Sequence, residues 1–492
     1  MKKALFSPLQ ISLCTVGYLW ATGSSIQAQV TSDGTVNTIV TPNGNVAEIT
    51  GGETRGSNLF HSFQEFSVNT GNEASFLNAD SISNIFSRVT GGNISNIDGL
   101  IRANGSANLF LINPAGILFG ENASLSIGGS FYGSTADSIL FEGGEFSAAD
   151  LENPPLLTVN APIGLGFRDN PADISVTGNS NAGIFANLAV NPGQNFTLVG
   201  GNLSFDTGFA IAPSGRIELG GLSESGVVSL NEDFSFNFTD NVARADIDFT
   251  NGAGISVASE EGGSINLNAR NLTLTGGSRI IGGLVATEVN VTDAEAGNVT
   301  INATDTISLD GINPASGLNS AIQNNVESGA VGNAGDVQIT SKNLSITNGG
   351  QIQTIVRQAN PVFELSAGEG NGGNIKINTE EAVTISGVSE VFNLVTDQMG
   401  NTIPNSFPSL ISSSLDLGAT GESGAISITS GSLDLNDGGV IISSTSGIGN
   451  AGNITLDISN DISFDGVNQS ISGGILGGIF SNVESGAVGN GG

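Results

Sequence analysis

The sequence has almost none of the residues that build disulfides and transition-metal sites. It contains a single cysteine, Cys14, and a single histidine, His61. Cys14 falls within the N-terminal segment 1–28, which has the character of a secretory signal, so the mature chain is expected to have no disulfide. One histidine without a cysteine is too little for the usual zinc ligand sets. The absence of cysteine also suits a chain that crosses a membrane pore unfolded, because no covalent loop has to pass through.

Basic residues are scarce too, and their shortage narrows the range of partners. The chain has 13 Lys and Arg against 46 Asp and Glu, which gives a net charge of −33. The phosphates of nucleic acids and of anionic membranes would repel such a chain. We therefore expect no nucleic-acid partner. The acidic residues are spread along the sequence, which favours a role in solubility over a concentrated cation store.

Long hydrophobic runs are missing outside the N-terminus. Two lysines precede an apolar stretch from Leu9 to Trp20, which is shorter than the ~20 residues that a membrane span requires. The stretch Ile26-Gln27-Ala28 ends in a small residue, and cleavage after Ala28 is predicted. Residues 1–28 are therefore interpreted as an export signal rather than as a membrane anchor.

Signals for catalysis are few, and no catalytic residue is predicted. His61 lies in Leu59-Phe60-His61-Ser62-Phe63, where we expect a strand or turn residue rather than a general base. No Gly-x-Ser-x-Gly elbow accompanies it. Asp246 and Asp248 share one face of a predicted strand, as the paired carboxylates of a polysaccharide lyase or hydrolase would. The same spacing also describes a solvated strand face.

Calcium needs only oxygen ligands, so acidic turns are candidate calcium sites. Asp293, Glu295 and Asp310 lie in or near Gly-rich turns. The ordered Gly-Gly-x-Gly-x-Asp repeat of calcium-binding β-helices is missing, and residues 368–373 resemble it only in their glycine content. We predict no metal site and no cofactor, with calcium binding left as the open alternative.

Glycine, by contrast, is abundant, and past position 250 it marks a repeat. A Gly, a small or polar residue and two alternating aliphatic residues recur six times, at unequal intervals. The copies are Gly263-Ser264-Ile265-Asn266-Leu267, Gly297-Asn298-Val299-Thr300-Ile301, Gly335-Asp336-Val337-Gln338-Ile339, Gly373-Asn374-Ile375-Lys376-Ile377, Gly424-Ala425-Ile426-Ser427-Ile428 and Gly452-Asn453-Ile454-Thr455-Leu456.

This repeat predicts the fold class. Period-two alternation places Val299 and Ile301 on one face of a strand and their polar neighbours on the other. One such unit cannot bury its apolar side alone and has to stack on its neighbours. Unequal spacing argues against a propeller and favours an all-β, right-handed parallel β-helix, in which loops of any length leave the corners. We expect about 20 coils of ~20–25 residues, stacked into a rod on the order of 100 Å long.

A second, longer sequence repeat bears on the end of the chain. Residues 307–333 and 462–490 resemble each other, and the first copy leads into a strand at Gly335, whereas the second is followed only by Gly491 and Gly492. The expectation from this comparison is a repeat region, residues 251–492, that is truncated at its C-terminus.

The most informative segment runs from Arg88 to Ala123. Two short apolar runs, 109–112 and 117–119, flank Asn113-Pro114-Ala115-Gly116. Asn, Pro and Gly at these positions suit a type I β-turn, because Pro presets φ and Asn can bond its own backbone. Each run is apolar at every position, so both faces of both strands are expected to be covered.

This segment resembles the N-terminal secretion domain of two-partner secretion exoproteins, the filamentous-haemagglutinin family. The family motif Asn-Pro-Asn-Gly-Ile appears as Asn113, Pro114, Ala115, Gly116 and Ile117, with Ala in place of the second Asn. A second family motif, Asn-Pro-Asn-Leu, aligns poorly with Asn78, Ala79, Asp80 and Ser81. The flanking stretches Ser57 to Val68 and Ser83 to Asn93 also resemble the family, and the resemblance covers roughly residues 30–250.

The resemblance implies a route and a role. Residues 29–250, with a core at 30–145, would form the secretion domain, and the signal would direct export to the periplasm of a Gram-negative-type bacterium. A dedicated outer-membrane β-barrel transporter would then recognise the extended domain and pass the chain to the cell surface. The two motifs would be part of what the transporter recognises or of the folding nucleus. There it would act as a secreted adhesin, not an enzyme, and bind surface carbohydrate or neighbouring cells. The alternatives are a β-helical polysaccharide lyase or hydrolase and a structural surface-layer component.

Overall fold

The computed structural model describes residues 29–178, 188–239, 241–286, 293–396, 402–468 and 475–492. The predicted signal and its cleavage residue Ala28 lie outside these residues. Within them every regular element is a β-strand. Accordingly, none of the described residues forms a helix that could cross a membrane.

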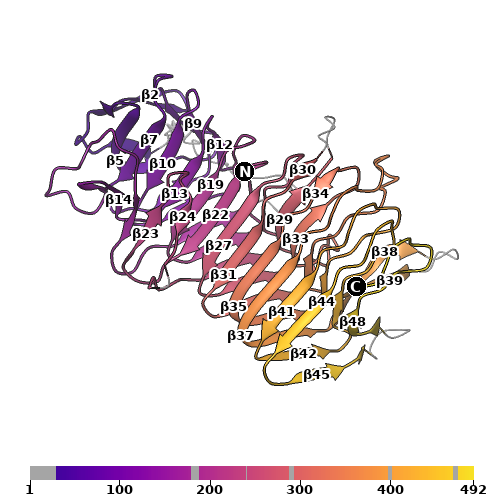
Figure 1. Cartoon of the computed structure of the whole chain (residues 1–492). Helices are drawn as coiled ribbons and strands as arrows, with labels where there is room; N and C mark the ends of the chain where they lie inside the picture. Colours follow the sequence, from indigo (N-terminus) through magenta and orange to yellow (C-terminus); the bar gives the residue numbers. More distant parts are fainter. Residues whose placement is uncertain (1–28, 179–187, 240, 287–292, 397–401, 469–474) are drawn as a thin grey trace, which may run out of the picture.

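The strands wind into a right-handed parallel β-helix, which confirms the predicted fold class (Figure 1). Its faces are parallel ladders in which each strand pairs with the strand of the next coil. The first face consists of β5 (Asn58–Ser67), β7 (Asn84–Val89), β10 (Asn108–Ile112), β13 (Phe131–Ser134), β19 (Phe196–Gly200), β22 (Arg216–Gly221), β27 (Ser264–Ala269), β31 (Val299–Ala303), β35 (Val337–Thr347), β37 (Ile375–Ser386), β41 (Ile426–Ser430) and β44 (Ile454–Ile458).

The second face follows the first around a corner. It consists of β8 (Ser95–Ile97), β11 (Ile117–Phe119), β17 (Ile174–Thr177), β20 (Leu203–Asp206), β25 (Ile247–Thr250), β28 (Leu272–Thr275), β32 (Thr306–Asp310), the second halves of β35 and β37, β42 (Ser432–Asn436) and β45 (Ile462–Asp465).

The third face is formed by two ladders. The first coils contribute β3 (Val46–Gly51), β6 (Glu73–Phe76), β9 (Leu100–Ala103) and β12 (Ser124–Ser126). The later coils contribute β18 (Leu188–Ala189), β21 (Phe209–Ile211), β26 (Gly254–Ser256), β29 (Arg279–Leu284), β33 (Ala321–Val326), β36 (Gln351–Gln353), β40 (Leu410–Ser412), β43 (Val440–Ile442) and β48 (Gly478–Phe480).

The six sequence repeats stack in register on the first face. Ile265 pairs with Val299, Val299 with Val337, and the series continues through Ile375 and Ile426 to Ile454. Each repeat is therefore one coil, whatever the length of its loops. The expected coil length of ~20–25 residues is wrong in this region, because long loops leave the corners. The strands of the first face span roughly 50 Å at ~4.8 Å per step, about half the length expected.

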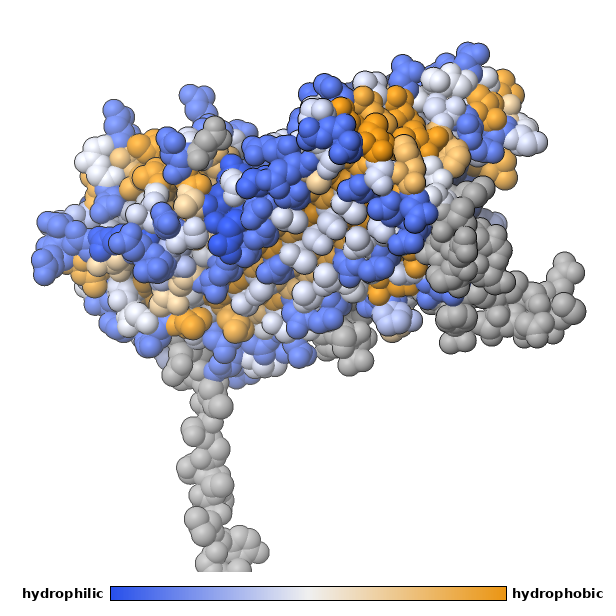
Figure 2. Space-filling model, turned by 90° about the horizontal axis from the view of Figure 1, so that it is seen from below, coloured by the Kyte–Doolittle hydropathy of each residue, from blue (hydrophilic) through white to orange (hydrophobic). Residues whose placement is uncertain are grey.

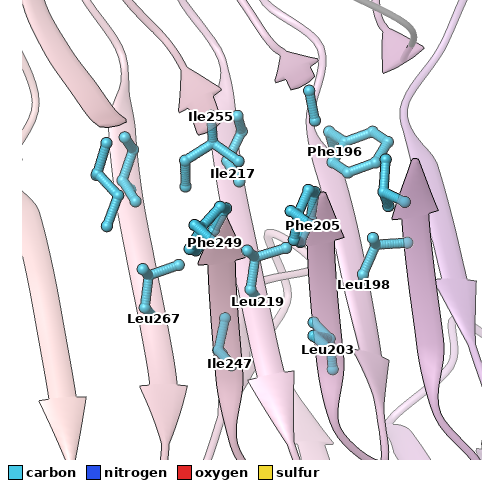
Figure 3. Close-up of a cluster of buried hydrophobic side chains, with 14 of the residues drawn as sticks. Phe196, Leu198, Leu203, Phe205, Ile217, Leu219, Ile247, Phe249, Ile255 and Leu267 are labelled. Atoms are coloured by element: carbon cyan, nitrogen blue, oxygen red, sulfur yellow. The ribbon is translucent and has the colours of Figure 1, made fainter. Parts of the chain in front are cut away.

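The interior is filled by columns of aliphatic and aromatic side chains (Figure 3). Phe205 and Phe249, on adjacent coils, stack with ring centroids 4.7 Å apart. Ile217, Leu219 and Leu267 point into the same space from the first face and are fully buried. The buried cluster continues without a break from Val30 to Ile441, so the core does not divide at residue 250. The division of the chain at that residue stays a prediction.

Extra strands close and flank the helix. At the N-terminal end β1 (Gln29–Ser32) and β4 (Glu53–Arg55) pair antiparallel with β5, and β2 (Thr38–Asn43) pairs antiparallel with β3. A separate antiparallel sheet lies beside the first face over the aromatic column Phe60, Phe86, Phe110 and Tyr132. This added sheet contains β14 (Ser138–Phe141), β15 (Gly144–Ser147), β16 (Gly164–Phe167), β23 (Gly226–Leu230) and β24 (Phe236–Asn237).

Short strand pairs extend from the corners of the later coils. They are β30 (Ala294–Glu295) with β34 (Gly332–Asn333), β38 (Val388–Thr396) with β39 (Thr402–Pro408), and β46 (Val467–Asn468) with β47 (Ile475–Leu476). Seen from below, the surface is a mosaic in which hydrophilic and neutral residues surround separate apolar groups (Figure 2).

Truncating one member of the aromatic stack tests the core. We expect Phe249→Ala to lower the free energy of unfolding by about 3–5 kcal/mol, because a fully buried ring leaves a cavity. The neighbouring Asp248 lies half-buried on the outer side of the same strand, so Asp248→Asn should change it by less than about 0.5 kcal/mol. Urea unfolding of both variants measures the difference, and equal effects would contradict the inward orientation of Phe249.

Candidate functional site

The predicted turn joins β10 to β11 at the corner between the first two faces. The backbone N–H of Gly116 donates to the carbonyl of Asn113 over 3.1 Å, which closes the β-turn. The Asn113 Oδ1 also accepts a hydrogen bond from the Ala115 N–H, 2.9 Å away. Asn and Pro thus occupy the positions that the sequence assigned to them, and the turn is present as predicted.

The side chain of Asn113 is fully buried and links neighbouring coils. Its Nδ2 donates to the carbonyl of Asn93 and to Ser95 Oγ, both at 2.9 Å. Its backbone N–H donates to the carbonyl of Ser134 on the following coil. Asn113 is 0% exposed, whereas Pro114 and Ala115 remain partly exposed. In the folded domain, therefore, the asparagine builds the turn and is inaccessible to another protein.

The flanking strands differ slightly from the expectation that both faces are covered. All positions of the run 109–112 are buried, as predicted. In β11, Ile117 and Phe119 are buried, but Leu118 is 38% exposed. That part of the expectation is wrong, because β11 lies on an outer face that no second layer covers among the described residues, and its middle residue points to solvent.

The weaker motif lies elsewhere, after β6 on the third face. Asn78 is largely buried and exchanges hydrogen bonds with Asn104 on the next coil, Nδ2 to carbonyl and Oδ1 from N–H, both at 3.0 Å. Ala79, Asp80 and Ser81 form a turn, closed by a bond from the Ile82 N–H to the carbonyl of Ala79. The two motifs thus occupy different corners of the coil, and each uses its asparagine to connect coils.

The same local turn recurs far downstream. Asn313, followed by Pro314 and Ala315, accepts a hydrogen bond from the Ala315 N–H at 2.9 Å, the distance found at Asn113. Asn313, however, is only half-buried, and its proline and alanine are exposed. The chain therefore contains a matched Asn-Pro-Ala turn that lacks the burial of the candidate motif.

A buried arginine lies one coil before the motif, and the sequence patterns did not identify it. Arg88 pairs in register with Ile112 and is 1% exposed. Its Nε donates to Ser62 Oγ at 2.8 Å, its Nη2 to Thr35 Oγ1 at 3.0 Å, and its Nη1 to the carbonyl of Ser147. Arg88 thereby joins the N-terminal segment, the first coil and the added sheet.

The counter-charge of Arg88 comes from the N-terminal segment. Asp33 accepts hydrogen bonds from Ser62 Oγ and Thr90 Oγ1. Burial lowers the pKa of Arg88, and the negative charge of Asp33 partly offsets this by raising it. Burial raises the pKa of Asp33, but the hydrogen bonds from Ser62, Thr35 and Thr90 outweigh burial and lower it below the usual range. Residues 33–35 therefore complete the charge balance of a buried site.

His61 is a strand residue, as expected. It lies on β5, is 1% exposed, and its Nδ1 is 3.2 Å from Thr38 Oγ1. Its ring contacts Phe63 and Phe76. Burial lowers the pKa of His61 to about 4, so at neutral pH it is an uncharged part of the packing.

The candidate carboxylate pair is not arranged for catalysis. Arg270 donates to both carboxylate oxygens of Asp246, at 2.8 Å to Oδ1 and 2.6 Å to Oδ2, and Asn271 Nδ2 donates to Oδ1 at 2.9 Å. The hydrogen bond from Arg270 lowers the pKa of Asp246, which opposes a role as a general acid. Asp248 lies half-buried on β25.

The candidate calcium residues are likewise not assembled. Asp310 accepts hydrogen bonds from Thr347 and Asn348, and Glu295 accepts one from Asn333. Across the described residues, no three His, Cys, Asp or Glu side chains gather as ligands for a metal ion.

Removing the buried asparagine tests the turn. We expect Asn113→Ala to lower the free energy of unfolding by about 3 kcal/mol, because it removes the bonds to Asn93 and Ser95 and leaves the fully buried Ser95 hydroxyl without this partner, at roughly 1–3 kcal/mol for a buried group. Asn313→Ala removes the same local bond at a half-buried site and should cost about 1 kcal/mol. Urea titrations compare the two variants, and equal losses would show that burial at Asn113 contributes nothing.

The buried histidine predicts a pH dependence. The unfolded chain protonates His61 near pH 6.5, whereas the folded chain does so only near pH 4. The unfolded state therefore binds more protons between these values, and the stability due to neutral His61 is lost as the pH falls from 6.5 to 4. The loss amounts to about 3 kcal/mol at most. His61→Gln should flatten this part of the stability profile, measured by urea unfolding between pH 7 and 4, and parallel profiles would contradict the assignment.

Comparison with known proteins finds one family match and two distant structural likenesses. The family model for the TPS secretion domain matches residues 28–267. The secretion domain of HMW1 from Haemophilus influenzae is similar in structure at 16% sequence identity, with a TM-score of 0.49 over 87% of this chain and 98% of that one. The secretion domain of filamentous hemagglutinin is similar at 12% identity, with a TM-score of 0.37 over 87% and 99%. No curated protein sequence matches the chain.

Both structural likenesses are distant, and the family match carries the assignment. It begins directly before β1 and ends within β27, so it covers the N-terminal strands, the candidate turn and the added sheet. Residues 28–267 belong to the TPS secretion domain family, and the chain is therefore an exoprotein of the two-partner secretion type.

Proposed function

We propose that the chain leaves the periplasm through a partner outer-membrane β-barrel transporter and acts outside as a surface adhesin. The observation that carries the proposal is the secretion domain at residues 28–267, which contains the buried Asn113 turn. In the extended chain Asn113 and Pro114 are accessible, and the transporter can bind them. In the folded chain they are part of the coil-to-coil contacts.

Folding outside the cell can make the transport directional. Each coil pairs only with its neighbours, so coils can close in the order in which they emerge. A closed coil buries side chains such as Leu267 and Ile301 and is too wide to return through a pore sized for an extended chain. This step needs no nucleotide, which suits a compartment without ATP.

The adhesive role is supported by the shape and chemistry of the exterior. Threonine and serine side chains line up on the second face, as in the in-register row Thr273, Ser308, Ser345 and Thr384. They are half-buried and offer hydroxyl groups to solvent, which is compatible with carbohydrate on surfaces or neighbouring cells. The lyase or hydrolase alternative is not favoured, because Asp246 is held by Arg270.

The matched turns provide the test of export. In the strain that produces the chain, we expect Asn113→Ala with Pro114→Ala to reduce secreted protein at least fivefold, with the chain retained in the periplasm. Asn313→Ala with Pro314→Ala makes the same chemical change outside the matched family region and should leave secretion within twofold. Immunoblots of culture medium and periplasm measure both. Equal secretion of the two variants would remove the Asn113 turn from the mechanism.

A further inference from the structure

A surface groove lies beside the Asn113 turn, where three segments distant in sequence meet. The end of β7, the turn itself and the residues after β15 enclose a space of about 230 Å³. Its apolar lining is formed by Val89, Pro114, Ala115, Ala148, Ala149 and Leu151.

Small residues keep this groove open. Gly92 at its edge has a φ of 78° and open space where a side chain would begin. At Ala115 the chain departs from the family motif, which has an asparagine, and the shorter side chain leaves room in the groove. Leu151 on its rim is 51% exposed, and Ile94 on the other side of the turn is 58% exposed. Together with the partly exposed Pro114 and Ala115, these side chains bring apolar surface into contact with water around the turn, and a bound partner would cover it.

The charges around the groove are mainly acidic. Asp150 and Glu152 flank Leu151, and neither takes part in a salt bridge among the described residues. Hydrogen bonds from Asn153 and Glu152 lower the pKa of Asp150, and Arg168 adds a weaker attraction, so this carboxylate stays charged. The complementary partner therefore carries an apolar side chain beside Lys or Arg.

We infer that this groove is the site at which the folded secretion domain docks on its transporter, with an apolar side chain of the transporter, flanked by basic residues, seated against Ala115. The inference rests on the proposed export route. It adds a second contact to the recognition of the extended chain, because the groove exists only after the first coils have closed and the added sheet has docked. The docked domain would stay at the exit of the pore while later coils emerge, and Ala115 would set which side chain fits.

The chain has no cysteine after Cys14, so a single introduced thiol reports contacts at one position. Leu151→Cys, labelled with a benzophenone maleimide in the producing strain, should crosslink to an outer-membrane protein that disappears when the transporter gene is deleted. Ile39→Cys, on an exposed position of β2 away from the groove, is the matched control and should give at least fivefold less of this product.

Two changes in the Leu151→Cys background test the groove itself. Asp150→Lys with Glu152→Lys reverses the rim, and Ala115→Leu fills the space; each should lower the crosslink at least fivefold. Asp457→Lys with Asp461→Lys makes the same charge change on a distant part of the chain and should leave it unchanged. Melting temperatures of the purified variants confirm that they are folded.

The outcomes separate this inference from the export route. Persistence of the crosslink in both groove variants, or an equal product from Ile39→Cys, overturns docking at the groove. Transporter-dependent secretion without any Leu151 crosslink leaves the export route intact and also overturns docking. Secretion that continues after deletion of the transporter gene overturns both.

Discussion

The whole molecule depends on parallel backbone pairing that places equivalent side chains directly above one another. Each coil offers the next a row of N–H and C=O groups and a row of aliphatic side chains, and Ile265, Val299 and Val337 repeat at the same height of successive coils. Neither row is satisfied in an isolated coil, because the backbone groups and the apolar surface both need a neighbour. Stability is therefore shared between adjacent coils, and the fold extends one layer at a time.

Such a stack needs a different solution where it begins. The first coil is closed by antiparallel strands, by the neutral ring of His61 and by the Asp33–Arg88 arrangement. Arg88 also reaches the added sheet through Ser147 and lies over the ring of Phe146 at 4.7 Å. Farther along, Glu218 accepts a hydrogen bond from the Phe236 N–H on β24, and burial raises the pKa of Glu218 to about 7 despite the nearby Arg216. Polar groups thus hold the added sheet against the first face at both ends.

Much of this arrangement follows from local sequence patterns. Alternating aliphatic residues predicted the strands and their inward faces, the unequal repeat spacing predicted a β-helix, and Asn113-Pro114 predicted a turn. Sequence placed Asn113 in a turn and aligned Asn78 with a family motif, but the burial and coil-to-coil bonds of both residues depend on neighbours far away in the chain. The same reason explains which features the sequence patterns did not predict. Arg88, the exposed side of Leu118 and the added sheet are decided by which segments pack together, which no short window of sequence contains. The coil length was wrong because residues in loops add to the spacing without adding a layer.

The variable length of the corner loops has a consequence for evolution. The coil that begins at Gly373 is nearly twice as long as the one that begins at Gly424, yet each occupies a single step of the stack. Closing a longer loop adds little entropic cost, since the penalty grows only with the logarithm of its length. Segments can therefore be grafted or lost at a corner without moving the register of any later strand. The loops and strand pairs at the corners can therefore change during evolution while the secretion domain that the transporter encounters keeps the same structure.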